Sequence, residues 1–186
     1  MVGEEAVAFV AASLRTSTAR ARRLAHTALP AGFARSVAGA ARVLLVEGAT
    51  DAAVFGVLLE GSGVRVVAAG GKHALPLAAA LCRAHGAAVH VVLDGDGGAW
   101  RRSRTPARAR ATARRATAQV LADLAPAPVT TLQDDLEAEL AQWPSFTVPA
   151  TKDPAAYEAA ARAAARDDLP VVLRTVLAEV REHGGG

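Results

Sequence analysis

The chain has 186 residues and a formal net charge of +3, and 52% of its residues are hydrophobic while only 4% are aromatic. This length favours one compact domain, and this composition excludes an intrinsically disordered chain. A single cysteine, Cys82, excludes an internal disulfide and a cysteine-based zinc cluster. The opening residues lack the pattern of a signal peptide, and no apolar run approaches the length that crosses a bilayer, so we expect a cytoplasmic protein without a membrane partner.

The predicted elements begin with a helical segment at residues 4–29, which ends at Pro30. Beyond it, short apolar runs alternate with segments of helical length. The apolar runs are 42–46, 64–68, 89–93 and, more weakly, 128–131; the helical segments are 50–59, 72–85 and 106–124. Continuous apolar runs are typical of strands buried on both faces, and their alternation with helices predicts a parallel sheet.

This order predicts an α/β fold in which a Rossmann-like parallel sheet is flanked by helices, with helical additions at both ends. We expect three regions. Residues 1–40 form an N-terminal helical annex and residues 41–133 form the core. Residues 134–186, where the pattern is helical again, form a C-terminal segment that completes the active site.

Acidic residues follow two of the predicted strands directly. Glu47 comes after the first strand, and Asp94 and Asp96 come after the third. Because such sheets bind ligands in the crevice at the carboxyl ends of their strands, we expect these carboxylates to converge. Converging acids repel one another, and Mg²⁺ or Mn²⁺ relieves that repulsion through oxygen ligands. The pattern therefore predicts a metal site, although an Asp-Gly turn alone would also explain Asp94 and Asp96.

Four segments together resemble the TOPRIM domain that topoisomerases, primases and several nucleases share, and more narrowly the TOPRIM domain of the OLD (overcoming lysogenization defect) nucleases. They are LLVEGATD at 44–51, GGK at 70–72, VVLDGDG at 91–97 and DLE at 135–137. The resemblance covers about residues 40–155. It implies a Mg²⁺- or Mn²⁺-dependent endonuclease that cleaves phosphodiesters of DNA, or of RNA, with two metal ions.

The resemblance also implies which residues form the site. The implied metal ligands are Glu47, Asp51, Asp94, Asp96 and Glu137. Lys152 is expected to join Glu47, Asp94 and Asp96 as a catalytic residue by stabilising the charge on the scissile phosphate. Asp51 equally suits the first turn of a helix, where the helix dipole favours an acid, and Glu137 is one of four acids in its segment.

Basic residues are concentrated in two stretches, 15–42 and 101–115, which hold 13 of the 21 lysines and arginines. Such surfaces suit a polyanion, although solvated helix faces give the same pattern. Lys72 follows two glycines at a predicted helix start, a position that suits a phosphate. The residues expected to contact nucleic acid, with DNA favoured, are Lys72, Arg101, Arg102, Arg104, Arg108 and Arg115.

Three alternatives stay open. The chain has no G-x-x-x-x-G-K-[ST] motif, so we expect no ATP site here, and a separate ATPase subunit could be its partner. The chain could instead be a nucleic-acid-binding or regulatory subunit that does not cleave and works with that ATPase. In either case its Ala-rich helices could form the interface of a homodimer. A receiver-like phosphate-binding domain fits less well, because receivers place paired acids after the first strand and only Glu47 stands there.

Overall fold

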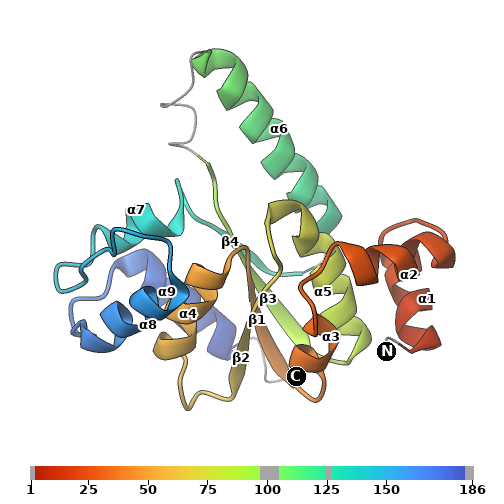
Figure 1. The fold of residues 1–186 in the computed structure, drawn as a ribbon, viewed down its shortest axis with the longest axis horizontal. Coiled ribbons are helices and arrows are strands. Elements are labelled where there is room, and N and C mark those ends of the chain that lie inside the picture. Colours follow the sequence, from red (N-terminus) through yellow and green to blue (C-terminus); the bar gives the residue numbers. More distant parts are fainter. Residues whose placement is uncertain (1–2, 97–104, 125–126, 183–186) are drawn as a thin grey trace.

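The computed structural model describes residues 3–96, 105–124 and 127–182. Four parallel strands form one sheet in the order β2-β1-β3-β4. The strands are β1 (Arg42–Val46), β2 (Val64–Ala68), β3 (Ala88–Leu93) and β4 (Val129–Thr131). The prediction of a parallel sheet and of its strands is confirmed, with ends that differ by at most one residue. The α/β, Rossmann-like fold class is confirmed with it (Figure 1).

Apolar residues of β1 alternate between two cores, which explains why its sequence is continuously hydrophobic. Val43 and Leu45 pack into the core under α1 (Glu4–Ser13), α3 (Phe33–Val37) and α5 (Leu75–Ala84). Leu44 and Val46 pack on the other face of the sheet, under α4 (Ala49–Leu58), α8 (Pro154–Ala163) and α9 (Val171–Glu182). Successive side chains of a strand point to opposite faces, so a strand covered on both sides must be apolar at every position.

The segment predicted as one helix at 4–29 is two helices, α1 and α2 (Thr18–Thr27). Arg15 adopts a positive φ of 49°, which breaks the helix, and the Ser17 side chain then accepts a hydrogen bond from the backbone N–H of Arg20 to start α2. A further short helix, α3, follows Pro30 and was not predicted. In Figure 1, α1 and α2 lie together beside α5, on the opposite side of the sheet from α4 and α8.

The C-terminal part is helical as predicted, with α7 (Leu136–Leu140) followed by α8 and α9. Trp143 fixes the loop between α7 and α8, since its indole N–H donates to the backbone oxygen of Ala165 at 2.8 Å and to Asp168 at 2.6 Å. Phe146 stacks on the Trp143 ring at a centroid distance of 5.3 Å. None of the helices in the described parts is both long and apolar enough to span a membrane.

The strand order creates a switch point between β1 and β3. From β1 the chain crosses to β2 on one side, and it returns to add β3 and β4 on the other side. In open parallel sheets a crevice forms at such a point, beyond the carboxyl ends of the two strands. The residues that follow β1 and β3 are Glu47 and Asp94, so the fold brings the two predicted acidic segments to one place.

Candidate functional site

Glu47 connects the carboxyl ends of three strands. It follows β1, and its Oε1 accepts a hydrogen bond of 3.0 Å from the backbone N–H of Asp94, which follows β3. Its backbone oxygen accepts from the N–H groups of Gly70 and Gly71 after β2, at 3.0 and 2.9 Å. The side chain of Glu47 is 17% exposed, so most of its contacts are with protein rather than with water.

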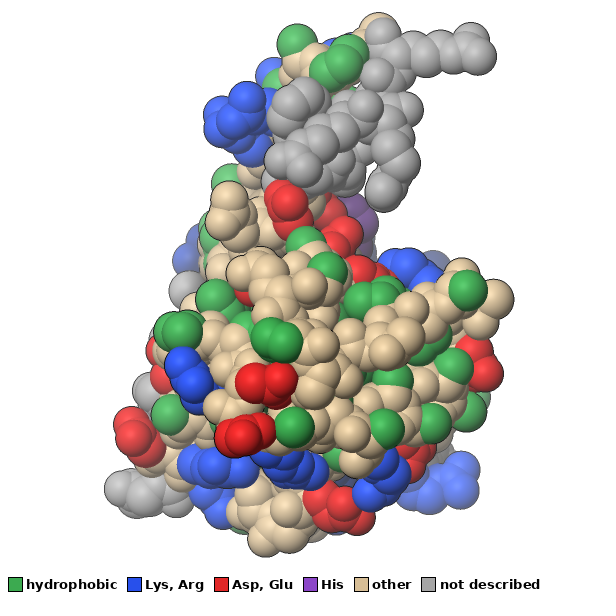
Figure 2. All heavy atoms as spheres, turned by 90° about the vertical axis from the view of Figure 1, so that its left-hand side faces the viewer, with side chains coloured by type: hydrophobic (Ala, Val, Ile, Leu, Met, Phe, Trp, Pro, Cys, Tyr) green, Lys and Arg blue, Asp and Glu red, His purple; other side chains and the backbone are tan. Residues whose placement is uncertain are grey.

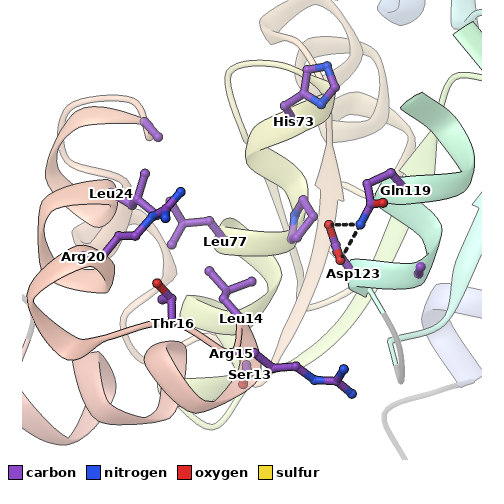
Figure 3. A pocket seen from close by; sticks show the side chains of 13 residues that line it. Ser13, Leu14, Arg15, Thr16, Arg20, Leu24, His73, Leu77, Gln119 and Asp123 are labelled. Carbon is purple, nitrogen blue, oxygen red and sulfur yellow. Dashed lines mark hydrogen bonds between the residues drawn. The ribbon is translucent and has the colours of Figure 1, made fainter. Parts of the chain in front are cut away.

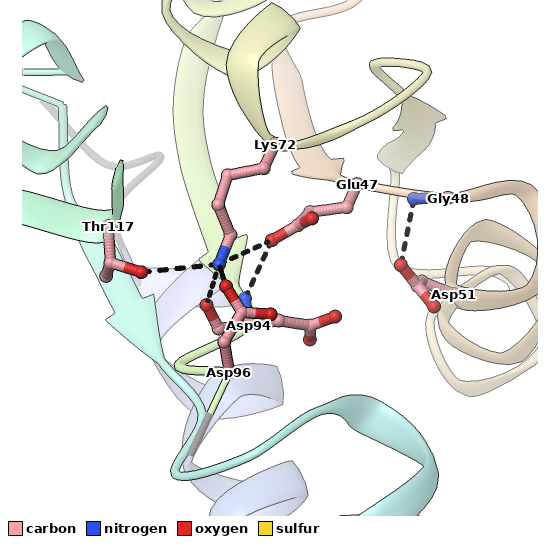
Figure 4. Close-up of polar contacts among 7 residues, drawn as sticks. All are labelled: Glu47, Gly48, Asp51, Lys72, Asp94, Asp96 and Thr117. Carbon is pink, nitrogen blue, oxygen red and sulfur yellow. Dashed lines mark hydrogen bonds and ion pairs between the residues drawn. The ribbon is translucent and has the colours of Figure 1, made fainter. Parts of the chain in front are cut away.

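Lys72 places its ammonium group among the acids (Figure 4). It belongs to the short 3₁₀ helix η1 (Lys72–Ala74), and its side chain is only 10% exposed. The ammonium donates to the carboxylate of Asp96 and, at 2.6 Å, to the backbone oxygen of Asp94. It lies 3.3 Å from Thr117 Oγ1 and 3.9 Å from Glu47 Oε1. Oxygens of four residues from three segments of the chain therefore surround one positive charge.

Burial, with repulsion from nearby acids, raises the pKa values of Glu47 and Asp94. Burial is the largest cause for Asp94, and the negative charges of Glu47, Asp51 and Asp135 add to it, raising the pKa of Asp94 to about 8. Burial also raises the pKa of Glu47, against the hydrogen bond from Asp94 and the charge of Lys72. Burial is thus the main reason that both carboxyl groups hold their protons to a higher pH than usual.

The loop after β3 is held tightly against the chain that follows β4. A Cβ on Gly95 would overlap the backbone oxygen of Leu132 and lie 2.7 Å from that of Gln133. Asp96 has a positive φ of 54°, and its N–H donates to the backbone oxygen of Asp134 at 2.9 Å. The glycine is required at this point because the two backbones approach so closely, and the approach directs the Asp96 carboxylate toward Lys72.

Asp51, Glu137 and Lys152, which were also predicted as site residues, lie near one another. Asp51 lies in the first turn of α4, where its Oδ2 accepts from the N–H of Gly48 at 2.9 Å. Burial is the largest cause of its raised pKa, and the charge of Glu137 also raises it. The ammonium of Lys152 lies 2.7 Å from Glu137 Oε1, and the Lys152 side chain is 75% exposed. Asp51 therefore caps the start of α4 through this hydrogen bond, and its carboxylate is also repelled by the negative charge of Glu137.

Three of the four acids at 134–139 have different surroundings in the structure. Asp135 caps α7 by accepting from the N–H of Ala138 at 2.9 Å, and Glu139 is buried at 4% exposure. Glu137 instead contacts Lys152. Its position is compatible with the predicted role as a late metal ligand.

The chemistry of the donors fits a hard divalent cation, since carboxylate and carbonyl oxygens are the ligands that Mg²⁺ and Mn²⁺ prefer. The described side chains, however, are not arranged as a metal site. Over the parts of the chain that the structure describes, no three acid, histidine or cysteine side chains are grouped so that they could hold a metal ion. The ammonium of Lys72 takes the position between Glu47 and Asp96 instead.

Two of the arginines predicted to contact nucleic acid lie on α6 (Pro106–Leu124), the helix that projects from the body of the molecule. Arg108 and Arg115 are both exposed. Figure 2 shows basic side chains near the projecting end. The other face of α6 reaches the site, because Thr117 is buried against Lys72. Arg101, Arg102 and Arg104 lie outside the described residues.

A pocket of about 780 Å³ lies apart from the acids, between α2, α5 and α6 (Figure 3). Arg15, Arg20 and His73 line it, together with Asp123, whose carboxylate accepts two hydrogen bonds of 3.0 Å from Gln119. It contains none of the residues that the sequence analysis proposed for the site.

The contacts of Lys72 with the acids and with Thr117 were not predicted from the sequence. Lys72 was expected to face a phosphate, whereas here it faces carboxylates. The scarcity of lysine was a signal, since the chain has only Lys72 and Lys152 among its 21 cationic residues. Nothing in the sequence indicated that Thr117, inside an arginine-rich helix, would contact Lys72, because the two residues are 45 positions apart.

Residues 40–96 match the family model described as overcoming lysogenization defect protein-like, TOPRIM domain. The match runs from β1 to Asp96 and therefore includes Glu47, Asp51, Lys72 and Asp94, but it ends before Glu137 and Lys152. Among curated proteins, no sequence matches the chain.

Proposed function

We propose that this chain is a metal-dependent endonuclease that hydrolyses phosphodiesters of DNA, and secondarily of RNA. The match of residues 40–96 to the OLD-like TOPRIM model supports the proposal, because that fold is associated with metal binding and with nucleases. The observation that carries the proposal is the convergence of Glu47, Asp94 and Asp96 beyond the carboxyl ends of β1 and β3. A buried structural core has no use for such a cluster of acids.

In this proposal Glu47, Asp94 and Asp96 hold one Mg²⁺ or Mn²⁺ ion, and Asp51 and Glu137 help to hold a second. Bound metal ions supply charge neutralisation at the scissile phosphate and lower the pKa of water. Glu47 is kept in position by the N–H of Asp94, and Asp51 by the N–H of Gly48. Lys152 has an exposed, long side chain, which suits contact with a phosphate that arrives from solvent.

The exposed arginines of α6 would hold the nucleic acid through its phosphates without reading its sequence. Arg108 and Arg115 are on the described part of that helix, and the proposal extends to Arg101, Arg102 and Arg104. Lys72 is kept in the proposal as a residue that contacts phosphate once it is free of Asp96. The chain lacks a nucleotide-binding P-loop motif, so any ATP-driven step would need a separate ATPase subunit.

Cleavage of supercoiled plasmid and of single-stranded RNA tests the proposal, with Mg²⁺, Mn²⁺ or EDTA present. We expect metal-dependent nicking that Glu47→Gln and Asp96→Asn abolish. Glu158→Gln is the matched control, since it removes an equally charged but exposed carboxylate whose partner is Arg162, away from the site. Cleavage that persists in both site variants contradicts the assignment.

A second candidate function is a nucleic-acid-binding or regulatory subunit that does not cleave. The position of Lys72 favours it, because a permanent internal cation would make a metal ion unnecessary. This candidate predicts salt-dependent binding of DNA, weakened by Arg108→Gln and Arg115→Gln, without turnover in any metal.

A further inference from the structure

The ammonium of Lys72 lies among the acids of the site. We infer that Lys72 is an internal competitor of the metal ion: its ammonium occupies the cation position between Glu47 and Asp96, and a divalent ion binds there only by displacing it. The inference rests on the metal site of the proposed function. It adds that the affinity of that site for metal is set by how strongly Lys72 is held.

The ammonium has the surroundings of a bound cation rather than those of a surface charge. It contacts the Asp96 carboxylate, the Asp94 carbonyl at 2.6 Å and the Thr117 hydroxyl at 3.3 Å, with Glu47 at 3.9 Å. Its side chain is 10% exposed, so protein oxygens have replaced most of its water. These are the oxygen types that a hard divalent ion takes as ligands.

Lys72 and a divalent ion exclude each other at this position. Both would use the oxygens of Asp96 and Glu47, and two positive charges held there a few ångströms apart repel strongly where water is scarce. The two cations are therefore alternatives at this position: either the ammonium of Lys72 or a divalent ion lies between Glu47 and Asp96.

The lysine can leave without disturbing the sheet. It stands in η1, after Gly70 and Gly71, whose φ values of 88° and 132° place the turn outside regular structure. Rotation about the four carbon–carbon bonds of its side chain moves the ammonium by several ångströms while the backbone stays in place. Glu47 keeps its hydrogen bond from Asp94 throughout, so the metal ligands remain positioned.

Chemical labelling of lysine tests the inference on the unmodified chain. Lys72 and Lys152 are its only lysines, so an amine-acylating reagent followed by peptide mass spectrometry reports on both separately. In EDTA we expect Lys72 to be labelled on the order of tenfold more slowly than Lys152, whose side chain is 75% exposed. Saturating Mn²⁺ should accelerate labelling of Lys72. An unchanged or slower rate at Lys72 overturns the inference.

Metal affinity provides the second measurement, by titration calorimetry with Mn²⁺. Lys72→Met removes the charge but keeps a flexible side chain of similar length, and we expect it to bind Mn²⁺ about tenfold more tightly than the wild-type chain. Lys72→Arg keeps the competing charge and should gain no affinity. Arg162→Met is the control, since it removes one positive charge from an exposed ion pair with Glu60. Equal or weaker binding by Lys72→Met overturns the inference.

A second variant covers the case in which Lys72→Met does not fold. If Lys72→Met does not fold in EDTA, Thr117→Val removes a hydrogen bond to the lysine without changing a metal ligand. A roughly twofold to threefold gain in Mn²⁺ affinity is then expected.

Cleavage is measured separately, so that failure of the inference can be told from failure of the proposed function. Tighter metal binding by Lys72→Met without cleavage by any form would sustain the inference and defeat the nuclease proposal. Cleavage by the wild-type chain, together with a metal affinity that Lys72→Met leaves unchanged, would support the nuclease proposal and overturn the inference.

Discussion

The carboxylate of Glu47 accepts a hydrogen bond from the backbone N–H of Asp94 at 3.0 Å. The two residues are 47 positions apart, and each follows the end of its own strand. Pairing of β1 with β3 in register, Leu45 beside Val91, sets this contact. The hydrogen bond orients a largely buried carboxylate toward the position that the ammonium of Lys72 occupies.

Gly95 should tolerate no side chain. Gly95→Ala would force a Cβ into the backbone oxygen of Leu132, and the strands or loops must then move apart. We expect a loss of about 1–3 kcal/mol in the free energy of unfolding, measured by urea denaturation. Gly56→Ala is the matched control: Gly56 is exposed within α4 and a Cβ there meets nothing within 4 Å. It should gain up to about 1 kcal/mol, and equal effects at both glycines would refute the argument.

Asp94 should make the metal-free chain less stable as the pH rises. Burial, followed by repulsion from Glu47, raises the pKa of Asp94 in the folded chain to about 8, from an ordinary value of 3.8. Between these two values the folded state holds a proton that the unfolded state has lost. The free energy of unfolding therefore falls with pH across this window, with a slope below about 1.4 kcal/mol per pH unit from this group, and levels off above pH 8.

Asp94→Asn should remove that contribution, which is checked by denaturation in EDTA at pH 5, 6, 7 and 8. The variant is expected to lose less stability than the wild-type chain over the series. Asp167→Asn, at an exposed position, serves as the reference for removing one carboxylate elsewhere. Parallel curves for Asp94→Asn and the wild type would show that Asp94 does not titrate in this range.

Cys82 should react only when the chain unfolds. It is fully buried in α5, and burial raises the pKa of its thiol to about 12. Thiol reagents react with the thiolate. The raised pKa makes the thiolate form rare, and burial keeps reagents away from the sulfur, so both effects protect Cys82. Labelling with a chromogenic disulfide is expected to be negligible in buffer and complete in denaturant. Rapid labelling of the folded chain would mean that α5 opens locally.

Lys152→Gln should separate activity from stability. The ion pair with Glu137 is exposed on the lysine side, so its loss should change the free energy of unfolding by less than about 1 kcal/mol. If Lys152 contacts the scissile phosphate as proposed, cleavage should fall by at least about tenfold while DNA binding stays within a few fold. A proportional loss of both binding and cleavage would instead assign Lys152 to general phosphate binding.

The strands and the convergence of the acids could be predicted from the sequence because both depend on local patterns. A strand covered on two faces must be apolar at each position, as residues 42–46 and 89–93 are, and parallel strands bring their carboxyl ends to one edge. Glu47, Asp94 and Asp96 follow such runs directly, so their place at one edge could be predicted, whereas their meeting also required that β1 and β3 be neighbours in the sheet.

The cation among those acids could not be predicted in the same way. Lys72 reaches Asp96 and Thr117 across 24 and 45 residues of sequence, and nothing near it in the chain indicates either partner. The break at Arg15 and the close approach of Gly95 to Leu132 are likewise matters of packing between segments. The periodicity of apolar residues indicates which face of a helix or strand is buried. The partner of a buried charge, by contrast, depends on how separate elements pack, and only the tertiary structure determines that packing.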